Sequence, residues 1–269
     1  MLVYLLSKTE NPEKLIASAG KLCYSSSDIH SLMERQTPEE TERFINLLNS
    51  MGHESPLEHV SFSFGVEGIS RITEIQLVRH RIASYSIQSG RYVKRDCPEY
   101  IIPIGIKENT LALDYYSGMI AKNIDDYNNL FLILMLDYIG FSEEHIKSLS
   151  IEKRIELVAE FKSKNKKEYF KLEKIAIENA RYGQFQSIST KIVFTMNLRS
   201  LINFTRHREC SRAQDEIQEL AKEVIRIINE EHPILGKLLG APCRFGKCPE
   251  GAKSCGKPKG EKKWLNLKT

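Results

Sequence analysis

The segment His59-Val-Ser-Phe-Ser-Phe-Gly-Val66 carries the clearest structural signal in the chain. Its apolar residues alternate with small or polar ones, which is the period-two pattern of a strand with one buried face. Gly65 and Gly68 are expected to help end this strand. We therefore predict a half-buried β-strand that begins at His59 and covers residues 59–66.

The sequence on both sides of this strand has the spacing of helices. Apolar residues recur every three or four positions over 70–82, and again after Ser211 until Pro233 stops the pattern. Ser211 lies three positions before a glutamine, which predicts a capping box. We also predict a helix over 193–207, helices over about 104–176, and short helical pieces in the first fifty residues. One of these pieces is expected to be capped by Thr37, with Pro38 at its first position.

Strands and helices are mixed without a strict βαβ alternation, so the predicted fold class is α+β. The basic stretch 162–168 lies in the helical middle and carries no chemical motif. We expect it to be solvated surface.

Composition indicates an ordinary globular protein. The chain has 269 residues, of which 41% are hydrophobic and 28% charged, and its formal net charge is +4. The longest apolar run, over 130–136, is far shorter than the roughly 18–20 residues that span a membrane. The N-terminus has no basic segment and no small-residue cleavage site of a secretory signal. We expect a cytoplasmic protein without a membrane partner.

The six cysteines do not form the pattern of a disulfide scaffold. Three are scattered singly, as reduced thiols are, at Cys23, Cys97 and Cys210. The other three, Cys243, Cys248 and Cys255, lie in a tail rich in Gly, Pro and Lys. Their Cys-x4-Cys-x6-Cys spacing is a weak zinc motif without an evident fourth ligand, although His232 lies upstream. We favour loop thiols and predict no metal.

Two basic clusters are candidates for chemistry. The first is Arg79-His80-Arg81 followed by Ser89-Gly90-Arg91, and the second contains Arg199, Asn203, Arg206, His207, Arg208 and Arg212. Guanidinium groups bind phosphate bidentately and stay charged at physiological pH. Either cluster alone is more often a set of solvated charges or surface salt bridges. A loop rich in hydroxyls and amides, 84–92, lies between them, and its Gly90 permits a positive φ for close approach to a phosphate. A simple turn remains the alternative.

Three blocks resemble the flavin-dependent thymidylate synthases, the ThyX family. The signature is Arg79-His80-Arg81, seven residues, and then Ser89-Gly90-Arg91-Tyr92; the segments 52–59 and 195–217 also match the family. The resemblance covers about residues 20–230, is weak across the helical middle and is absent from the cysteine tail. It implies a synthase domain over 1–233 and a separate tail over 234–269.

The family's fold and reaction follow as expectations from this resemblance. It implies an antiparallel sheet packed with several helices and a homotetramer whose ligand sites form between subunits. It also implies a methyltransferase that converts dUMP to dTMP. Methylenetetrahydrofolate supplies the carbon, and FAD reduced by NADPH carries the hydride.

The resemblance assigns ligand positions residue by residue. The FAD positions are His53, Ser55, Arg79, His80, Arg81, Ile87, Asn197, Arg199 and Asn203. The dUMP positions are Gln76, Arg79, Ile87, Gln88, Ser89, Gly90, Arg91, Arg181 and Arg208. Arg208 is expected to be catalytic, because a fixed cation stabilises the negative charge that develops when the uracil ring is activated. Ser89 is expected to bind substrate, since no neighbouring base would activate it as a nucleophile.

The sequence departs from the family at two places. Ile87 stands where the family often has Glu or Gln, so only its backbone can serve a ligand. After Arg181 the chain reads Tyr182-Gly-Gln-Phe-Gln186 where the family often continues with Leu-Pro. The second departure bears on the local turn and on the role of Arg181.

Other interpretations are weaker. The residues around His53 and His59 lack His-Glu-x-x-His spacing, and Ser55 to Glu58 predicts a capping box instead. Residues 251–257 resemble a P-loop, but Pro258 replaces the Ser or Thr that would bind magnesium. Cys210 is more simply a buried thiol than a nucleophile.

Two rival functions stay open at this point. The first is nucleic-acid binding through the basic helices and the end of the tail, Glu261-Lys-Lys-Trp264, but a net charge of +4 supports it poorly. The second is a flavin enzyme that acts on another nucleotide.

Overall fold

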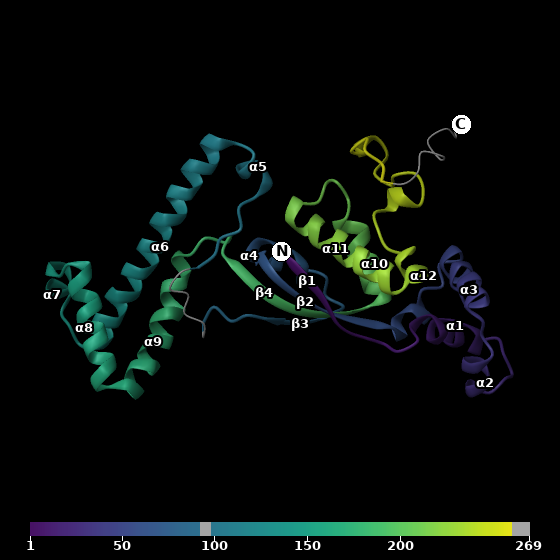
Figure 1. Cartoon of the computed structure of the whole chain (residues 1–269), viewed down its shortest axis with the longest axis horizontal. Coiled ribbons are helices and arrows are strands. Elements are labelled where there is room, and N and C mark those ends of the chain that lie inside the picture. Colours follow the sequence, from purple (N-terminus) through teal and green to yellow (C-terminus); the bar gives the residue numbers. More distant parts are fainter. Residues whose placement is uncertain (92–97, 260–269) are drawn as a thin grey trace. The chain divides into compact units, whose positions relative to one another are not determined.

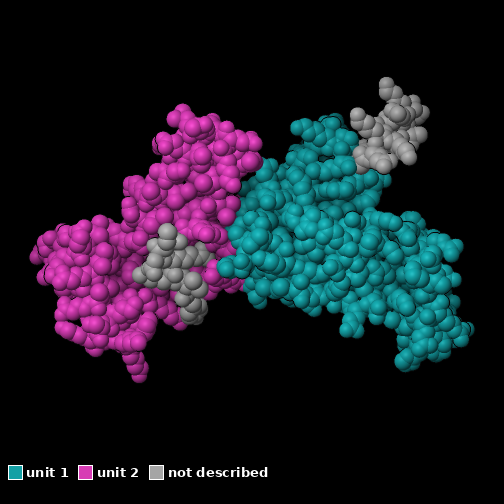
Figure 2. All heavy atoms as spheres, in the orientation of Figure 1, with its two compact units in different colours: residues 1–69, 73–86, 191–269 teal, residues 70–72, 87–190 magenta. Residues whose placement is uncertain are grey.

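The computed structural model describes residues 1–91 and 98–259. The chain divides into two compact units, one containing residues 1–69, 73–86 and 191–269 and the other residues 70–72 and 87–190 (Figure 2). Tyr92, Cys97 and the segment from Glu261 to Trp264, which the sequence analysis named, lie outside the described residues. The division at 233/234 stays a prediction.

The first unit is built on a four-stranded antiparallel sheet with the strand order β1-β2-β4-β3. The strands are β1 (Leu2–Lys8), β2 (Ser61–Ser70), β3 (Ser84–Ile87) and β4 (Ser189–Asn197). β1 and β2 pair with Leu2 opposite Glu67 and Lys8 opposite Phe62, with an irregularity between Leu5 and Ser7. The α+β class and the antiparallel sheet are therefore confirmed.

The helices of this unit come from the sequence before and after the middle segment of the chain. They are α1 (Pro12–Leu22), α2 (Ile29–Glu34), α3 (Pro38–Ser50), the 3-10 helix η1 (Ser55–His59), α4 (Arg71–Leu77), α10 (Leu198–Arg208), α11 (Asp215–Glu231), α12 (Pro233–Gly236), η3 (Pro242–Arg244) and η4 (Gly251–Lys253). Helices α10 and α11 lie across one face of the sheet (Figure 1).

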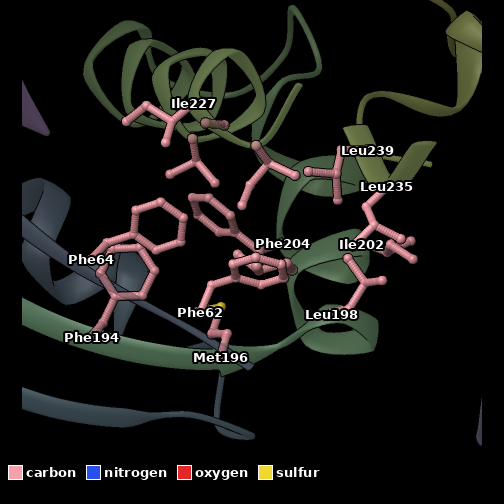
Figure 3. Close-up of a cluster of buried hydrophobic side chains, with 14 of the residues drawn as sticks. Phe62, Phe64, Phe194, Met196, Leu198, Ile202, Phe204, Ile227, Leu235 and Leu239 are labelled. Atoms are coloured by element: carbon pink, nitrogen blue, oxygen red, sulfur yellow. The ribbon is translucent and has the colours of Figure 1, made fainter. Parts of the chain in front are cut away.

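Aromatic side chains join the sheet to α10. The rings of Phe64 on β2 and Phe194 on β4 stack at 5.2 Å, and Phe204 of α10 lies 6.5 Å from Phe194 (Figure 3). All three side chains are completely buried. Burying such a ring stabilises the fold by about 1.5–3 kcal/mol, so this cluster fixes α10, which carries the second basic cluster, against the sheet.

The second unit is helical and has its own core. Its helices are α5 (Ile104–Lys107), α6 (Thr110–Tyr138), α7 (Glu143–Ser148), α8 (Ile151–Lys164), α9 (Lys166–Ala180) and the 3-10 helix η2 (Arg181–Gly183). Phe131, Met135 and Leu136 of α6 pack with Ala176 and Ile177 of α9. The predicted helices over the middle of the chain and the exposed basic stretch are confirmed. None of the described helices combines the length and apolarity needed to cross a membrane.

The sheet extends further than the sequence analysis predicted. The N-terminal residues form β1 and not a helical piece, because they pair with β2 along their length. The predicted strand at 59–66 begins at Ser61 and continues through both glycines to Ser70. Gly68 adopts a φ of 72° without ending it. The helix predicted over 70–82 ends at Leu77.

The predicted helix over 193–207 begins only at residue 198. Residues 189–197 form β4, whose even-numbered residues 190–196 are buried and whose odd-numbered ones are more exposed. Asn197 then caps α10, since its side chain accepts a hydrogen bond from the backbone N–H of Ser200 at 2.8 Å.

One of the three predicted caps is confirmed. Thr37 forms a capping box with Glu40, and Pro38 occupies the first turn of α3. The box predicted at Ser55 is wrong, because this segment is a 3-10 helix without a side-chain cap. The box at Ser211 is also wrong: the Ala213 N–H bonds to the Cys210 carbonyl in a turn, and α11 begins only at Asp215.

Candidate functional site

A hollow of about 710 Å³ in the first unit collects most of the predicted FAD positions. We name it the arginine hollow. It is lined by Glu54, Glu58, Arg79, His80, Arg81, Ile82, Asn197, Arg199, Ser200, Ile202, Asn203 and Arg206. The loop after α4 and the exposed side of α10 therefore meet here. His53 and Ser55 are exposed beside η1 and do not line the hollow.

Two carboxylates orient the arginines of α10. Arg199 donates from Nε to Glu54 Oε2 at 3.0 Å and also from Nη1 to Glu58, and Arg206 Nη1 lies 3.7 Å from Glu54 Oε1. The hydrogen bond that Arg199 donates to Glu58, followed by the one that it donates to Glu54, raises the pKa of Arg199. The sequence analysis weighed Glu54 and Glu58 for a metal site and Glu58 for a capping box, and it missed their contacts with the arginines of α10.

Arg79 and Arg81 are exposed and pair with no carboxylate among the described residues. The arginine hollow thus contains four guanidinium groups and two carboxylates. The excess of positive charge favours an anionic ligand, and guanidinium groups suit a phosphate or pyrophosphate.

Arg208 and His80 form a directed pair at the end of α10. Arg208 Nε donates to His80 Nε2 at 3.0 Å, and Arg208 Nη2 donates to the Gln76 carbonyl at 3.3 Å. Burial, together with the charges of Arg208 and His207, lowers the pKa of His80 to about 4. His80 is therefore neutral near pH 7, with its proton on Nδ1. Burial, with the charge of Arg79, also lowers the pKa of Arg208, but a guanidinium stays charged at that pH.

Tyr85 fixes the loop that carries the Arg-His-Arg motif. Its hydroxyl donates to the carbonyls of Leu77 at 2.9 Å and His80 at 2.7 Å. Burial raises the pKa of Tyr85 to about 12, so Tyr85 keeps its hydroxyl proton. The sequence analysis named the hydroxyl-rich loop 84–92 but assigned no role to Tyr85.

Nearby, the side chain of Gln76 donates to that of Gln214, which joins the α4 region to the start of α11.

The remaining predicted dUMP positions lie in the second unit. Ser89 Oγ accepts from the Arg91 N–H at 3.2 Å, and Arg91 Nε lies 2.9 Å from Glu178 Oε1 of α9. A Cβ placed on Gly90 would lie 3.7 Å from Arg181 Nη1, so the glycine packs beside this arginine. Gly90 does not use the positive φ that a glycine permits.

Arg181 is the most informative residue of this group. Its Nε is buried and has no hydrogen-bond partner among the residues that the structure describes. An unpaired buried donor on a charged group costs free energy unless a ligand satisfies it. Ser89, Gly90, Arg91 and Arg181 therefore form a candidate site for an oxyanion, which we name the Arg181 site. Ile87 ends β3, and Gln88 follows it.

Asn123 holds the turn after Arg181, where the sequence departs from the family. This buried residue of α6 donates from Nδ2 to the Gly183 carbonyl at 2.7 Å. Its Oδ1 accepts from the Phe185 N–H at 3.3 Å and from the Tyr100 hydroxyl at 2.9 Å. The altered segment is therefore a defined turn. A single asparagine on the apolar side of a long helix was the available signal, and the sequence analysis missed it.

The arginine hollow and the Arg181 site contain no cluster of metal-ligating side chains among the described residues. Among the described residues, no three His, Cys, Asp or Glu side chains converge as one metal ion requires. His232, the possible upstream zinc ligand, instead bonds from Nδ1 to Glu13 at 2.9 Å. Cys210 is a partly buried free thiol.

The chain is similar to proteins of known activity along almost its whole length. The family model described as thymidylate synthase complementing protein matches residues 4–234. A flavin-dependent thymidylate synthase of Clostridium tetani is 44% identical over 255 residues, which cover 95% of this chain and 93% of the relative. That of Geobacter sulfurreducens is 34% identical and covers 96% and 94%. A solved ThyX structure from Helicobacter pylori, complexed with FAD and dUMP, has a TM-score of 0.53 at 26% identity and covers 89% of this chain and 100% of that one.

Proposed function

The chain belongs to the family of flavin-dependent thymidylate synthases, and from this premise we propose that it reductively methylates dUMP to dTMP with methylenetetrahydrofolate and NADPH as co-substrates. The enzyme class is that of FAD-dependent methyltransferases. The observation that carries the proposal is the pairing of Arg208 with a neutral His80 beside the arginine hollow.

The arginine hollow fits FAD by the chemistry of its donors. Arg79 and Arg81 offer guanidinium groups that no described carboxylate occupies, which suits the pyrophosphate. Asn197, Arg199 and Asn203 of β4 and α10 add amide and guanidinium donors along one side. His53, Ser55 and the backbone of Ile87 complete the proposed FAD positions. When bound, the flavin supplies hydride chemistry, and the protein supplies position and shelter from water.

The Arg181 site fits the phosphate of dUMP. It combines a buried unpaired guanidinium nitrogen with the hydroxyl of Ser89 and the N–H groups of the loop. Gly90 lets the backbone lie against Arg181, and Arg91 is braced by Glu178. Gln88 is proposed to bind dUMP from the same loop.

Arg208 is the proposed catalytic residue. The carbon that is methylated is a poor nucleophile until charge develops on the uracil ring, and a fixed cation at the ring stabilises that charge. His80 and the Gln76 carbonyl occupy Nε and Nη2 of Arg208, so these contacts fix the direction of its free edge. Because His80 is neutral, it orients the guanidinium without adding a second charge. Gln76 and Arg79 are proposed to contact the same substrate.

We further propose a homotetramer whose complete sites form between subunits. In this proposal, residues 1–233 form the synthase domain and residues 234–269 a separate tail. The molar mass from light scattering tests the proposed homotetramer, for which we expect the mass of four chains of 30.9 kDa. A monomer that turns over at full rate would overturn it.

The function is tested by the visible absorption spectrum of the purified chain with added FAD, followed by a dUMP titration. We expect bound flavin whose spectrum changes on dUMP addition, and dTMP formation when NADPH and methylenetetrahydrofolate are supplied. Binding of RNA that falls steeply with salt, together with no FAD uptake, would favour the nucleic-acid rival. A flavin spectrum that responds to another nucleotide and not to dUMP would overturn the substrate assignment.

A further inference from the structure

A second hollow in the first unit, of about 630 Å³, is lined by four cysteines. We name it the cysteine hollow. Three of the four, Cys243, Cys248 and Cys255, come from the tail, and the fourth is Cys210, in the loop that follows α10. All four are free thiols. The Cys-x4-Cys-x6-Cys motif of the tail has no fourth ligand nearby in the sequence, and the fold supplies a fourth cysteine, Cys210, to the same hollow.

A buried carboxylate fixes Cys243 near Cys210. Glu209, next to Cys210, is only 1% exposed. Its carboxylate accepts from the Ala241 N–H at 2.7 Å and from Arg244 Nε at 2.7 Å. Cys243 lies between these two partners in the chain, so Glu209 positions the backbone on both sides of it.

A second anchor on the other side of Cys210 fixes the rest of the tail. Arg212 donates from Nη1 to the Lys253 carbonyl at 3.1 Å and to the Glu250 carboxylate at 3.3 Å. This segment connects Cys248 to Cys255. The short loop that carries Cys210 therefore holds both cysteine-bearing parts of the tail, and the four thiols face one hollow as a consequence.

The surroundings of the sulfurs suit thiolates. The Lys257 N–H donates to Cys255 Sγ and the Lys259 N–H donates to Cys243 Sγ, both at 3.4 Å. Backbone N–H groups that donate to cysteine sulfur are a usual feature of iron–sulfur sites, where they tune the cluster. Three further cations line the hollow against one carboxylate, namely Arg206, Arg212 and Lys247 against Glu250. This excess suits four thiolates with a cluster, which together carry a charge of about −2.

A zinc ion and an iron–sulfur cluster differ in the distance between their ligand sulfurs. Four thiolates on one zinc each lie about 2.3 Å from it, so their sulfurs come within about 4 Å of one another. No such convergence exists among the described His, Cys, Asp and Glu side chains. A [4Fe–4S] cluster takes one cysteine at each iron, and its ligand sulfurs stand farther apart, at about 6 Å. The hollow of about 630 Å³, lined by four cysteines, has room for this larger group.

We propose that the cysteine hollow binds a [4Fe–4S] cluster ligated by Cys210, Cys243, Cys248 and Cys255. The inference does not rest on the nucleotide chemistry proposed above, because none of these cysteines lines the arginine hollow. It gives the tail a role as a cofactor-binding module on the synthase.

The test is a metal and sulfide analysis of the full chain purified without oxygen, or reconstituted with ferrous iron and sulfide. We expect about four iron atoms and four acid-labile sulfides per chain. An electron paramagnetic resonance signal should appear on reduction with dithionite. One zinc per chain without sulfide, or no iron uptake with all thiols open to alkylation, would overturn the proposal.

Variants assign the ligands. Cys248→Ser and Cys255→Ser should each lose most of the bound iron and the resonance signal. Cys23→Ser is the matched control, because Cys23 is an exposed free thiol outside the hollow. FAD binding, measured separately, checks that each variant is folded. Full iron content in both tail variants would show that Cys248 and Cys255 are not ligands. If the parent chain held a cluster but bound no FAD, only the proposed function would be refuted.

Discussion

Arg208 donates a hydrogen bond of 3.0 Å from Nε to Nε2 of His80, and this contact fixes the tautomer of one residue and the direction of the other. An imidazole nitrogen can accept only when it carries no proton, so the His80 proton lies on Nδ1. Arg208 Nη2 is held by the Gln76 carbonyl, while Nη1 bonds to no described residue. These two contacts therefore fix the orientation of the Arg208 guanidinium, with Nη1 available to a ligand.

Replacing Arg208 by Ala should abolish dTMP formation while FAD stays bound. The variant removes the cation proposed to stabilise charge on the uracil ring, and loss of such a group costs about 100-fold or more in turnover. Initial rates of dTMP formation and the visible flavin spectrum measure the two effects. Arg208→Lys is the informative partner, because it keeps the charge but cannot bond to His80 and Gln76 together. Normal turnover in the Ala variant would remove Arg208 from the catalytic role.

The pKa of His80 should be measurable by NMR at about 4, well below the ordinary 6.5. A folded-state pKa below that of the unfolded chain means that the unfolded state takes up the proton more readily. The contribution of His80 to the free energy of unfolding is therefore complete above pH 6.5 and is lost as the pH falls toward 4. His80→Gln should flatten this part of the pH profile.

The control for this experiment is His30→Gln, because His30 is exposed on α2. That variant should leave the stability profile unchanged between pH 4 and 6.5. An unchanged slope in His80→Gln, or a His80 pKa near 6.5, would show that the imidazole is not held neutral by its surroundings.

Arg81→Gln should weaken FAD binding. The side chain lines the arginine hollow and pairs with no carboxylate of the described residues, so its positive charge is available to a phosphate. Loss of one charge-assisted hydrogen bond corresponds to about 10-fold to 100-fold in the dissociation constant. Fluorescence titration of FAD measures it. Arg43→Gln on α3 is the matched control, since Arg43 lies outside the hollow and donates to the Glu39 carbonyl. Equal affinities for the two variants would argue against phosphate binding by Arg81.

Ser89→Ala should raise the dissociation constant for dUMP more than it lowers the rate of the bound complex. The hydroxyl lies in the Arg181 site, where it is proposed to bind phosphate, and no general base contacts it among the described residues. A rise in KM with little change in kcat is the signature of lost binding. Complete loss of turnover at unchanged dUMP affinity would instead make Ser89 a nucleophile.

The fold was predictable where local periodicity and core burial agree. Residues 60–66 alternate, and the structure buries Phe62 and Phe64 beneath α10. The same alternation runs through Ile192, Phe194 and Met196, but the helix-like spacing that begins at residue 198 obscured it. The N-terminal strand was missed because pairing with β2, a contact about sixty residues away in sequence, determines its conformation.

The site was predictable in its residue types and less so in its geometry. The motif residues Arg79, His80 and Arg81 do meet Arg199 and Asn203 in one hollow. The roles of Glu54 and Asn123 depend on tertiary contacts, since each partners residues far away in the chain. A polar residue on an apolar helix face, as at Asn123, marks such a position, but no local pattern in the sequence identifies its distant partner.

Glu209→Ala should destabilise the first unit and release the tail. The carboxylate is buried, accepts from the Ala241 N–H and Arg244, and raises the pKa of Arg244 through that hydrogen bond. Removing the carboxylate leaves the buried Ala241 N–H without its acceptor, which costs about 1–3 kcal/mol, while the partly exposed Arg244 is solvated instead. Urea unfolding measures the loss, and limited proteolysis after residue 239 should become faster in native conditions.

The matched control is Glu223→Ala on α11, whose carboxylate pairs with Arg226 at 3.0 Å on the exposed surface. Exposed pairs gain little from solvent-screened attraction, so this variant should unfold at the same urea concentration as the parent chain. If both variants behaved alike, Glu209 would not anchor the tail. Because Glu209 also positions Cys243, its loss should lower iron retention in the cysteine hollow, whereas the Glu223 variant should retain the cluster fully.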